Sequence, residues 1–93
     1  MPPLSMLSIR NIQFSKLLKA GGQLREFNFT KSNPEGKMVF SVDVTDDRSN
    51  RIEFLVQKEN DLWKIQSKLL PEWILKNESN FHDIIESELQ YAS

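Results

Sequence analysis

Three carboxylates could form a small acidic site if the segments that carry them pair side by side. Glu26, Asp43 and Glu53 each occupy a polar position in one of three successive segments of alternating apolar and polar residues. If these segments pair as adjacent antiparallel strands, the three side chains fall in one row. Like charges in a row are destabilising, so a bound cation or a basic partner would explain them. The alternative, which we favour because exposed charges interact weakly, is that Arg51 and Lys64 neutralise the row in solvent.

Basic residues are concentrated in the first part of the chain. The net charge is −1 overall, but residues 1–40 hold six basic and two acidic residues, and the remainder holds six basic and eleven acidic residues. Such an asymmetry can indicate a basic arm that contacts an acidic partner or nucleic acid, the latter without sequence readout. No block reaches five like charges, which favours an ordinary solvated surface instead. The candidate basic patch comprises Arg10, Lys16, Lys19, Arg25, Lys31 and Lys37.

The other residues that could do chemistry form no recognisable catalytic or metal motif. There is no cysteine, and His82 is the only histidine, so a metal site would have to consist of carboxylates. The acidic stretch 46–50 lacks the glycine and the closing glutamate of a calcium-binding loop. Neither a Gly-x-Ser-x-Gly elbow nor a glycine-rich phosphate loop is present. We therefore expect no enzymatic activity, no cofactor and no metal.

The alternating segments predict an antiparallel sheet with one apolar side and one polar side. Stretches rich in Asn, Asp, Pro and Gly separate the segments and predict turns between consecutive strands. Together they indicate a four-stranded meander. The expected strands cover residues 24–31, 38–45, 51–58 and 62–67.

The register of these strands follows from the requirement that their apolar residues share one face. For the first hairpin the turn residues would also suit a bulged loop, which shifts the pairing by one residue. We follow the apolar pattern there, because misplaced phenylalanines would cost more than an imperfect turn. The predicted apolar pairs are Phe29 with Phe40, Val42 with Phe54, and Val56 with Trp63.

Two helices are expected to cover the apolar side of this sheet. Apolar residues at helical spacing predict a C-terminal helix over 79–90. A shorter helix is predicted over 9–20, ending at Gly21-Gly22, and residues 1–8 are expected to be flexible. The fold class is then α+β, with a single domain over the whole chain. It comprises a four-stranded antiparallel meander with a C-terminal helix and a short N-terminal helix packed on one face.

The composition predicts a soluble, cytoplasmic protein that interacts with another protein. No stretch approaches the roughly 20 apolar residues of a membrane span, and the first residues do not resemble a signal peptide. The polar side of the expected sheet carries no aromatic residue on which nucleotide bases could stack. We therefore expect a small noncatalytic protein-interaction module. Its partner is either another protein or a second copy of the chain, which would form a homodimer through a sheet edge or a helix. The alternative is a weak nucleic-acid-binding protein that uses the basic first part of the chain.

Overall fold

The computed structural model describes residues 12–32 and 36–92, which form a curled antiparallel sheet of five strands and two helices. The strands follow one another in the sheet in chain order, as in a meander. This confirms the α+β class, although the sheet has five strands where four are predicted. The elements are β1 (Gln13–Ala20), β2 (Gln23–Ser32), β3 (Val39–Thr45), β4 (Arg51–Glu59), β5 (Leu62–Ile65), α2 (Glu72–Leu75) and α3 (Glu78–Ala92).

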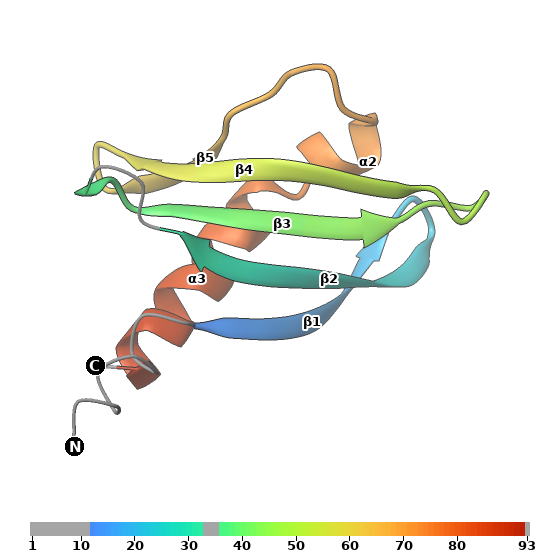
Figure 1. Ribbon diagram of the computed structural model, residues 1–93. Coiled ribbons are helices and arrows are strands. Elements are labelled where there is room, and N and C mark those ends of the chain that lie inside the picture. Colours follow the sequence, from blue (N-terminus) through green and yellow to red (C-terminus); the bar gives the residue numbers. More distant parts are fainter. Residues whose placement is uncertain (1–11, 33–35, 93) are drawn as a thin grey trace.

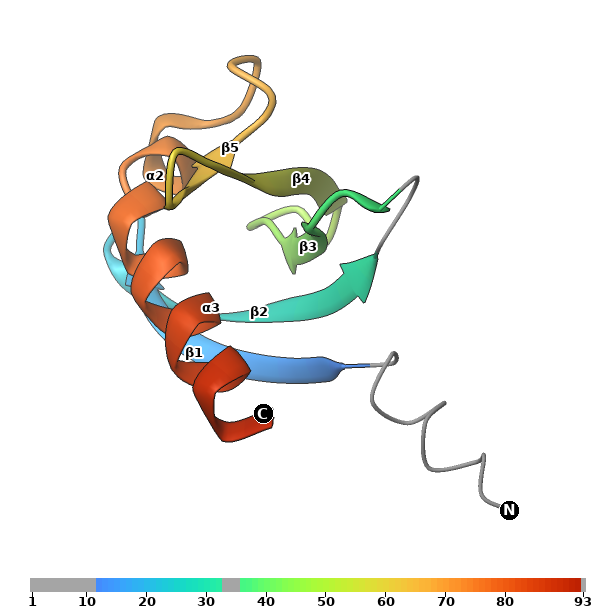
Figure 2. The ribbon, with the colours of Figure 1, turned by 90° about the vertical axis from the view of Figure 1, so that its left-hand side faces the viewer.

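Helix α3 fills the open side of the curled sheet. It runs diagonally from the neighbourhood of β5 toward β1 (Figure 1). Seen after a quarter turn, the strands follow an arc and α3 lies across its opening (Figure 2). Neither α2 nor α3, within the described residues, has the length and apolarity that a helical membrane crossing requires.

The core is an aromatic cluster built around one side chain of α3. Phe81 is fully buried, and its ring centroid lies 5.3 Å from that of Phe27, 6.0 Å from Phe29 and 5.6 Å from Phe54. Ile85, one turn further along α3, is fully buried as well. The helical spacing that predicts this face of the C-terminal helix is therefore confirmed.

The predicted N-terminal helix is wrong for residues 13–20, which form β1. Gly21 and Gly22 both have positive φ, 66° and 84°, and connect β1 to β2 as a two-residue hairpin turn instead of ending a helix. Phe14 and Leu18 lie on the same side of β1 and pack against the core. Lys16 lies between them and interrupts the apolar pattern, so the period of two is weak here. The start of the predicted helix and the segment 1–8 lie outside the described residues.

Two of the three predicted registers are shifted by two residues. Phe29 pairs with Val42 instead of Phe40, and Val56 pairs with Ile65 instead of Trp63. Each shift preserves the buried face, because side chains alternate with a period of two. The apolar pattern therefore cannot distinguish these registers. The middle hairpin, with Val42 opposite Phe54, has the predicted register.

Turn chemistry explains the shift in the last hairpin. The predicted register requires a turn at Glu59-Asn60, whereas the observed turn is Asn60-Asp61, with φ of 51° and 69°. Asn and Asp tolerate the left-handed region because their short polar side chains bond locally, and Glu does so less readily. The turn therefore moves by one residue and the strand pairing by two.

We expect Phe81→Ala to destabilise the fold strongly, because it removes the ring at the centre of the aromatic cluster. The free energy of unfolding should fall by about 3–5 kcal/mol, measured by urea denaturation. Leu69, which is 95% exposed, supplies the control: Leu69→Ala should change this free energy by less than about 0.5 kcal/mol. Similar losses in both variants would contradict the proposed centre of the core.

Candidate functional site

The two edges of the sheet differ in how their backbone groups are satisfied. At the β5 edge, two side chains of α3 accept hydrogen bonds from the strand. The Trp63 amide donates to His82 Nδ1 at 3.1 Å, and the Ile65 amide donates to Glu78 Oε2 at 2.8 Å. Glu78 and His82 lie one helical turn apart, so they face the strand together. The helix therefore replaces a neighbouring strand along β5.

A third residue of the same helical stripe completes this contact. The indole Nε1 of Trp63 donates to Glu86 Oε2 at 2.8 Å, and Lys58 Nζ lies 3.3 Å from the same oxygen. The hydrogen bond from Trp63, with a smaller contribution from Lys58, holds the pKa of Glu86 below its ordinary value of 4.5. Glu86 thus lies in a site that favours its charged form.

The opposite edge, formed by β1, has no such cap among the described residues. Lys31 N donates to Ile12 O at 2.8 Å, which identifies Ile12 and Lys31 as a hydrogen-bonded pair. Such pairs occur at every second residue of an antiparallel ladder, so the residues between them turn their N–H and C=O away from β2. No described strand pairs with these outward groups. They belong to Gln13, Ser15, Leu17 and Lys19, whose side chains are all exposed.

A buried arginine holds the β1–β2 hairpin in place. Arg25 is 8% exposed; its Nε donates to Ala20 O at 2.8 Å, and its Nη2 lies 3.1 Å from Asp47 Oδ1. Its guanidinium lies over the Trp73 ring, 4.2 Å from the centroid. A Cβ atom on Gly21 would lie 3.2 Å from Arg25 Nη2 and 3.3 Å from Trp73 Cγ, so a glycine permits this close approach. The hairpin is thereby joined to α2 and to the loop after β3.

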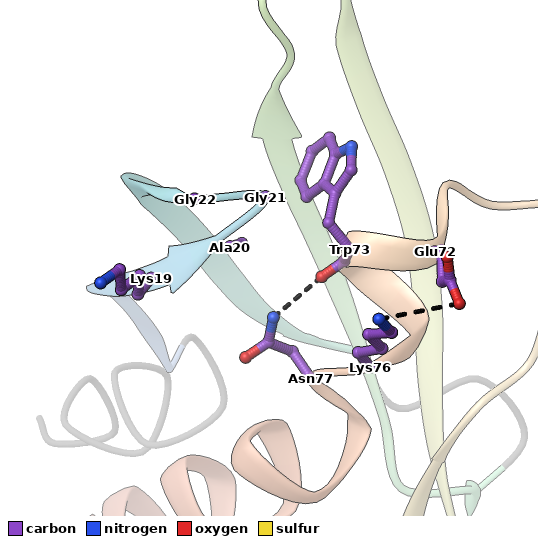
Figure 3. A pocket seen from close by; sticks show the side chains of 8 residues that line it. All are labelled: Lys19, Ala20, Gly21, Gly22, Glu72, Trp73, Lys76 and Asn77. Atoms are coloured by element: carbon purple, nitrogen blue, oxygen red, sulfur yellow. Dashed lines mark hydrogen bonds and ion pairs between the residues drawn. The ribbon is translucent and has the colours of Figure 1, made fainter.

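A surface hollow of about 550 Å³ lies between this hairpin and α2 (Figure 3). Its polar groups already contact one another: Asn77 Nδ2 donates to Trp73 O at 2.8 Å, and Lys76 Nζ lies 3.8 Å from Glu72 Oε2. The remaining lining comes from Lys19, Ala20 and the two turn glycines. The hollow thus offers an indole ring and a solvent-exposed amine, but no convergent set of polar groups.

A hydrogen-bonded network crosses the outer face of the sheet from β1 to β4. Ser15 Oγ donates to Asn28 Oδ1 at 2.6 Å, and Asn28 Nδ2 donates to Asp43 Oδ1 at 2.9 Å. Arg51 Nη2 lies 3.1 Å from Asp43 Oδ2 and 3.8 Å from Glu53 Oε2. The hydrogen bond to Asp43 raises the pKa of Arg51. The carboxylates of Asp43 and Glu53 therefore have partners within the chain.

The predicted acidic row is only partly assembled. Asp43 lies opposite Glu53, as expected, but Asn28 lies opposite Asp43 on its other side. Glu26 pairs with Leu17 of β1 and is not part of the row, because the first register is shifted by two residues. Within residues 12–32 and 36–92, no group of three or more acidic or histidine side chains could hold a metal ion. Arg51 neutralises Asp43 and Glu53, as the favoured interpretation predicts for this residue, whereas Lys64 lies on β5 opposite Gln57.

The candidate basic patch is dispersed. Arg25 is buried against Trp73 and paired with Asp47, and Lys16 Nζ lies 3.6 Å from Glu88 Oε2. A strand rises about 3.3 Å per residue, so the two ends of β2 are more than about 20 Å apart. Lys19 lies near the turn at one end of β2, Lys31 and Lys37 lie at its other end, and Arg10 lies outside the described residues.

Glu78 and His82 are the residues whose roles the sequence does not indicate. A single histidine in the first turns of a helix is ordinarily exposed or caps that helix, whereas His82 caps a strand. Their spacing of four residues shows only that they share a helix face. Their function depends on β5 being the last strand and on α3 crossing it, which are both tertiary properties.

Comparison of the chain with models of protein families, with curated proteins and with solved structures found no match. No relative therefore points to a substrate or a partner.

Glu78→Ala should open the β5 edge, because the Ile65 amide loses its acceptor. We expect this amide to exchange with solvent deuterium roughly tenfold faster, as measured by NMR, for a loss of about 1.4 kcal/mol. Glu78→Gln keeps a side-chain oxygen at this position and should have a smaller effect. Unchanged exchange in Glu78→Ala would contradict the capping role.

The lowered pKa of Glu86 predicts a pH dependence of stability. Folding stabilises the charged form of the Glu86 carboxylate. Its contribution to the free energy of unfolding is therefore complete well above the unfolded pKa of about 4.5, and it is lost as the pH falls through the lower pKa of the folded state. In urea denaturation below about pH 4.5, Glu86→Gln should therefore lose stability less steeply than the wild type. Trp63→Phe removes the main hydrogen-bond donor and should flatten the profile in the same way. Identical slopes in all three proteins would contradict the assignment.

Proposed function

We propose that this chain is a noncatalytic protein-interaction module that binds an extended segment of a protein partner along the outer edge of β1. The observation that carries the proposal is the difference between the two edges. Side chains of α3 accept hydrogen bonds from the outward amides of β5, whereas no described strand pairs with the outer edge of the eight-residue β1, the edge away from β2. An added strand would satisfy these backbone groups, as in other complexes formed by strand addition.

The side chains of this edge would restrict which segments can pair with it. Leu17 is 65% exposed at the middle of β1 and offers apolar area to a facing side chain. Lys16 and Lys19 disfavour a lysine or arginine directly opposite, because like charges in a cross-strand pair are destabilising. We therefore expect segments with an apolar centre and without basic residues opposite these lysines. The lack of cysteine agrees with action in the cytoplasm, which we also propose.

Binding of nucleic acid has less support. Two of the six basic residues are engaged in ion pairs with Asp47 and Glu88, and those described at the two ends of β2 do not form one surface. The outer face of the sheet displays the polar network of Asp43 and Arg51 where stacking aromatic rings would be required.

Leu17→Pro tests strand addition directly. Proline removes an outward N–H but no hydrogen bond to β2, so the fold should remain intact. Octapeptides selected from a displayed random library for binding to the wild type should bind Leu17→Pro at least about fivefold more weakly, since one hydrogen bond is worth about 1 kcal/mol. Fluorescence polarisation measures this difference.

Leu17→Thr is the matched control, because it changes the same side chain but keeps the N–H. Selected peptides should retain more affinity for Leu17→Thr than for Leu17→Pro, and circular dichroism should show that both variants are folded. The proposed edge is wrong if every selected peptide binds Leu17→Pro as tightly as the wild type, or if no peptide is selected at a protein concentration at which sedimentation shows a monomer.

A further inference from the structure

We propose that the segment that occupies the β1 edge is β1 of a second copy of this chain, paired antiparallel about Leu17. This inference rests on the proposed function, since it names the partner of the same edge. The resulting dimer would join the two five-stranded sheets into one continuous sheet across a twofold axis.

The sequence of β1 is complementary to itself in this alignment. With Leu17 opposite its counterpart, the outward backbone groups of Ser15 face those of the copy's Lys19, which is the geometry of hydrogen-bonded pairs in an antiparallel ladder. Lys16 faces Leu18 of the copy, so no lysine lies opposite a lysine.

The neighbouring alignments are less favourable. If the twofold axis moves by one residue to Lys16, the two copies of this lysine lie directly opposite each other, which is destabilising. If the axis moves to Leu18, the paired segment shortens to residues 16–20, whereas the alignment about Leu17 pairs residues 14–20. The alignment about Leu17 combines the longer ladder with the absence of like-charge pairs.

Side-chain burial supports the same alignment. Leu17 is a large apolar residue that projects from the outer face with 65% of its surface exposed, and its counterpart would cover it. On the inner face, Phe14 and Leu18 are only partly buried at the β1 end of the core. A strand added beside β1 would bury more of the surface of these two side chains.

The capped β5 edge explains why pairing would stop at two copies. A sheet with two open edges can add chains repeatedly, whereas self-pairing of one edge is symmetric and closes. Here the outward amides of Trp63 and Ile65 already donate to α3. β5 pairs only with residues 56–59 of β4, so the start of β4 leaves a shorter unpaired stretch on this side. The described part of the dimer would thus present no second open edge as long as β1.

A single cysteine reports on this geometry, because the natural chain has none. In the proposed dimer the Cα atoms of residue 17 in the two copies lie about 5.5 Å apart, within the range of a disulfide. Leu17→Cys should therefore form a covalent dimer under mild oxidation, seen as a band of doubled mass on a non-reducing gel. Sedimentation should show that the wild type is a dimer and that Leu17→Pro is a monomer.

Leu24→Cys is the matched control. Leu24 is 66% exposed, almost the same as Leu17, and lies on the adjacent strand. In the proposed dimer its two copies are three strand spacings apart across the sheet and also offset along it, so at least about 14 Å separates them and they cannot form a disulfide. Leu24→Cys should thus show at least tenfold less covalent dimer than Leu17→Cys at equal concentration.

Equal cross-linking of the two cysteine variants, or a wild type that is monomeric at millimolar concentration, would overturn the self-pairing. If library peptides then still bind in a manner sensitive to Leu17→Pro, the proposed function holds and the partner is a different protein. If such peptides are also absent, both the self-pairing and the proposed function fail.

Discussion

Backbone N–H and C=O groups at the edge of a sheet need hydrogen-bond partners, in the protein or in water, and at β5 the helix that covers the core supplies them. The curl of the sheet brings β5 and β1 to opposite sides of an opening that α3 spans (Figure 2). The helix buries Phe81 and Ile85 in the sheet and turns Glu78 and His82 toward β5. One helix therefore supplies both the core cover and the cap of one edge.

The described residues of α3 do not cap the outer edge of β1. There the helix contributes an ion pair, between Lys16 and Glu88, in place of acceptors for the outward backbone amides. The β1–β2 hairpin is held instead at its turn, where Arg25 joins Ala20, Asp47 and Trp73. Strand β1 is thus anchored at its turn and through its inner face, while no described strand pairs with the backbone groups of its outer edge. Such a strand is well suited to pair with another strand.

Sequence patterns predicted the parts of the fold that depend on local periodicity. Alternation located β2 to β5 within a few residues, and helical spacing located α3, because each pattern reports which side of one element is buried. Alternation could not distinguish registers that differ by two residues, so Phe29 and Val56 were assigned the wrong partners. It also failed for β1, where Lys16, on the same side of the strand as Phe14 and Leu18, remains exposed and forms an ion pair with Glu88 of α3.

The sequence by itself determined the α+β class, the inward-facing residues of four strands, the C-terminal helix and the polar character of the outer face. Only the tertiary structure decided which strands are edges, that Asn28 and not Glu26 lies beside Asp43, and that His82 caps a strand. The physical reason is the range of the interactions. Burial of one side of a strand or helix gives its sequence a periodic pattern of apolar residues, which can be recognised locally. The partner of an edge amide or of a surface carboxylate instead comes from residues far away in the chain that the fold brings into contact.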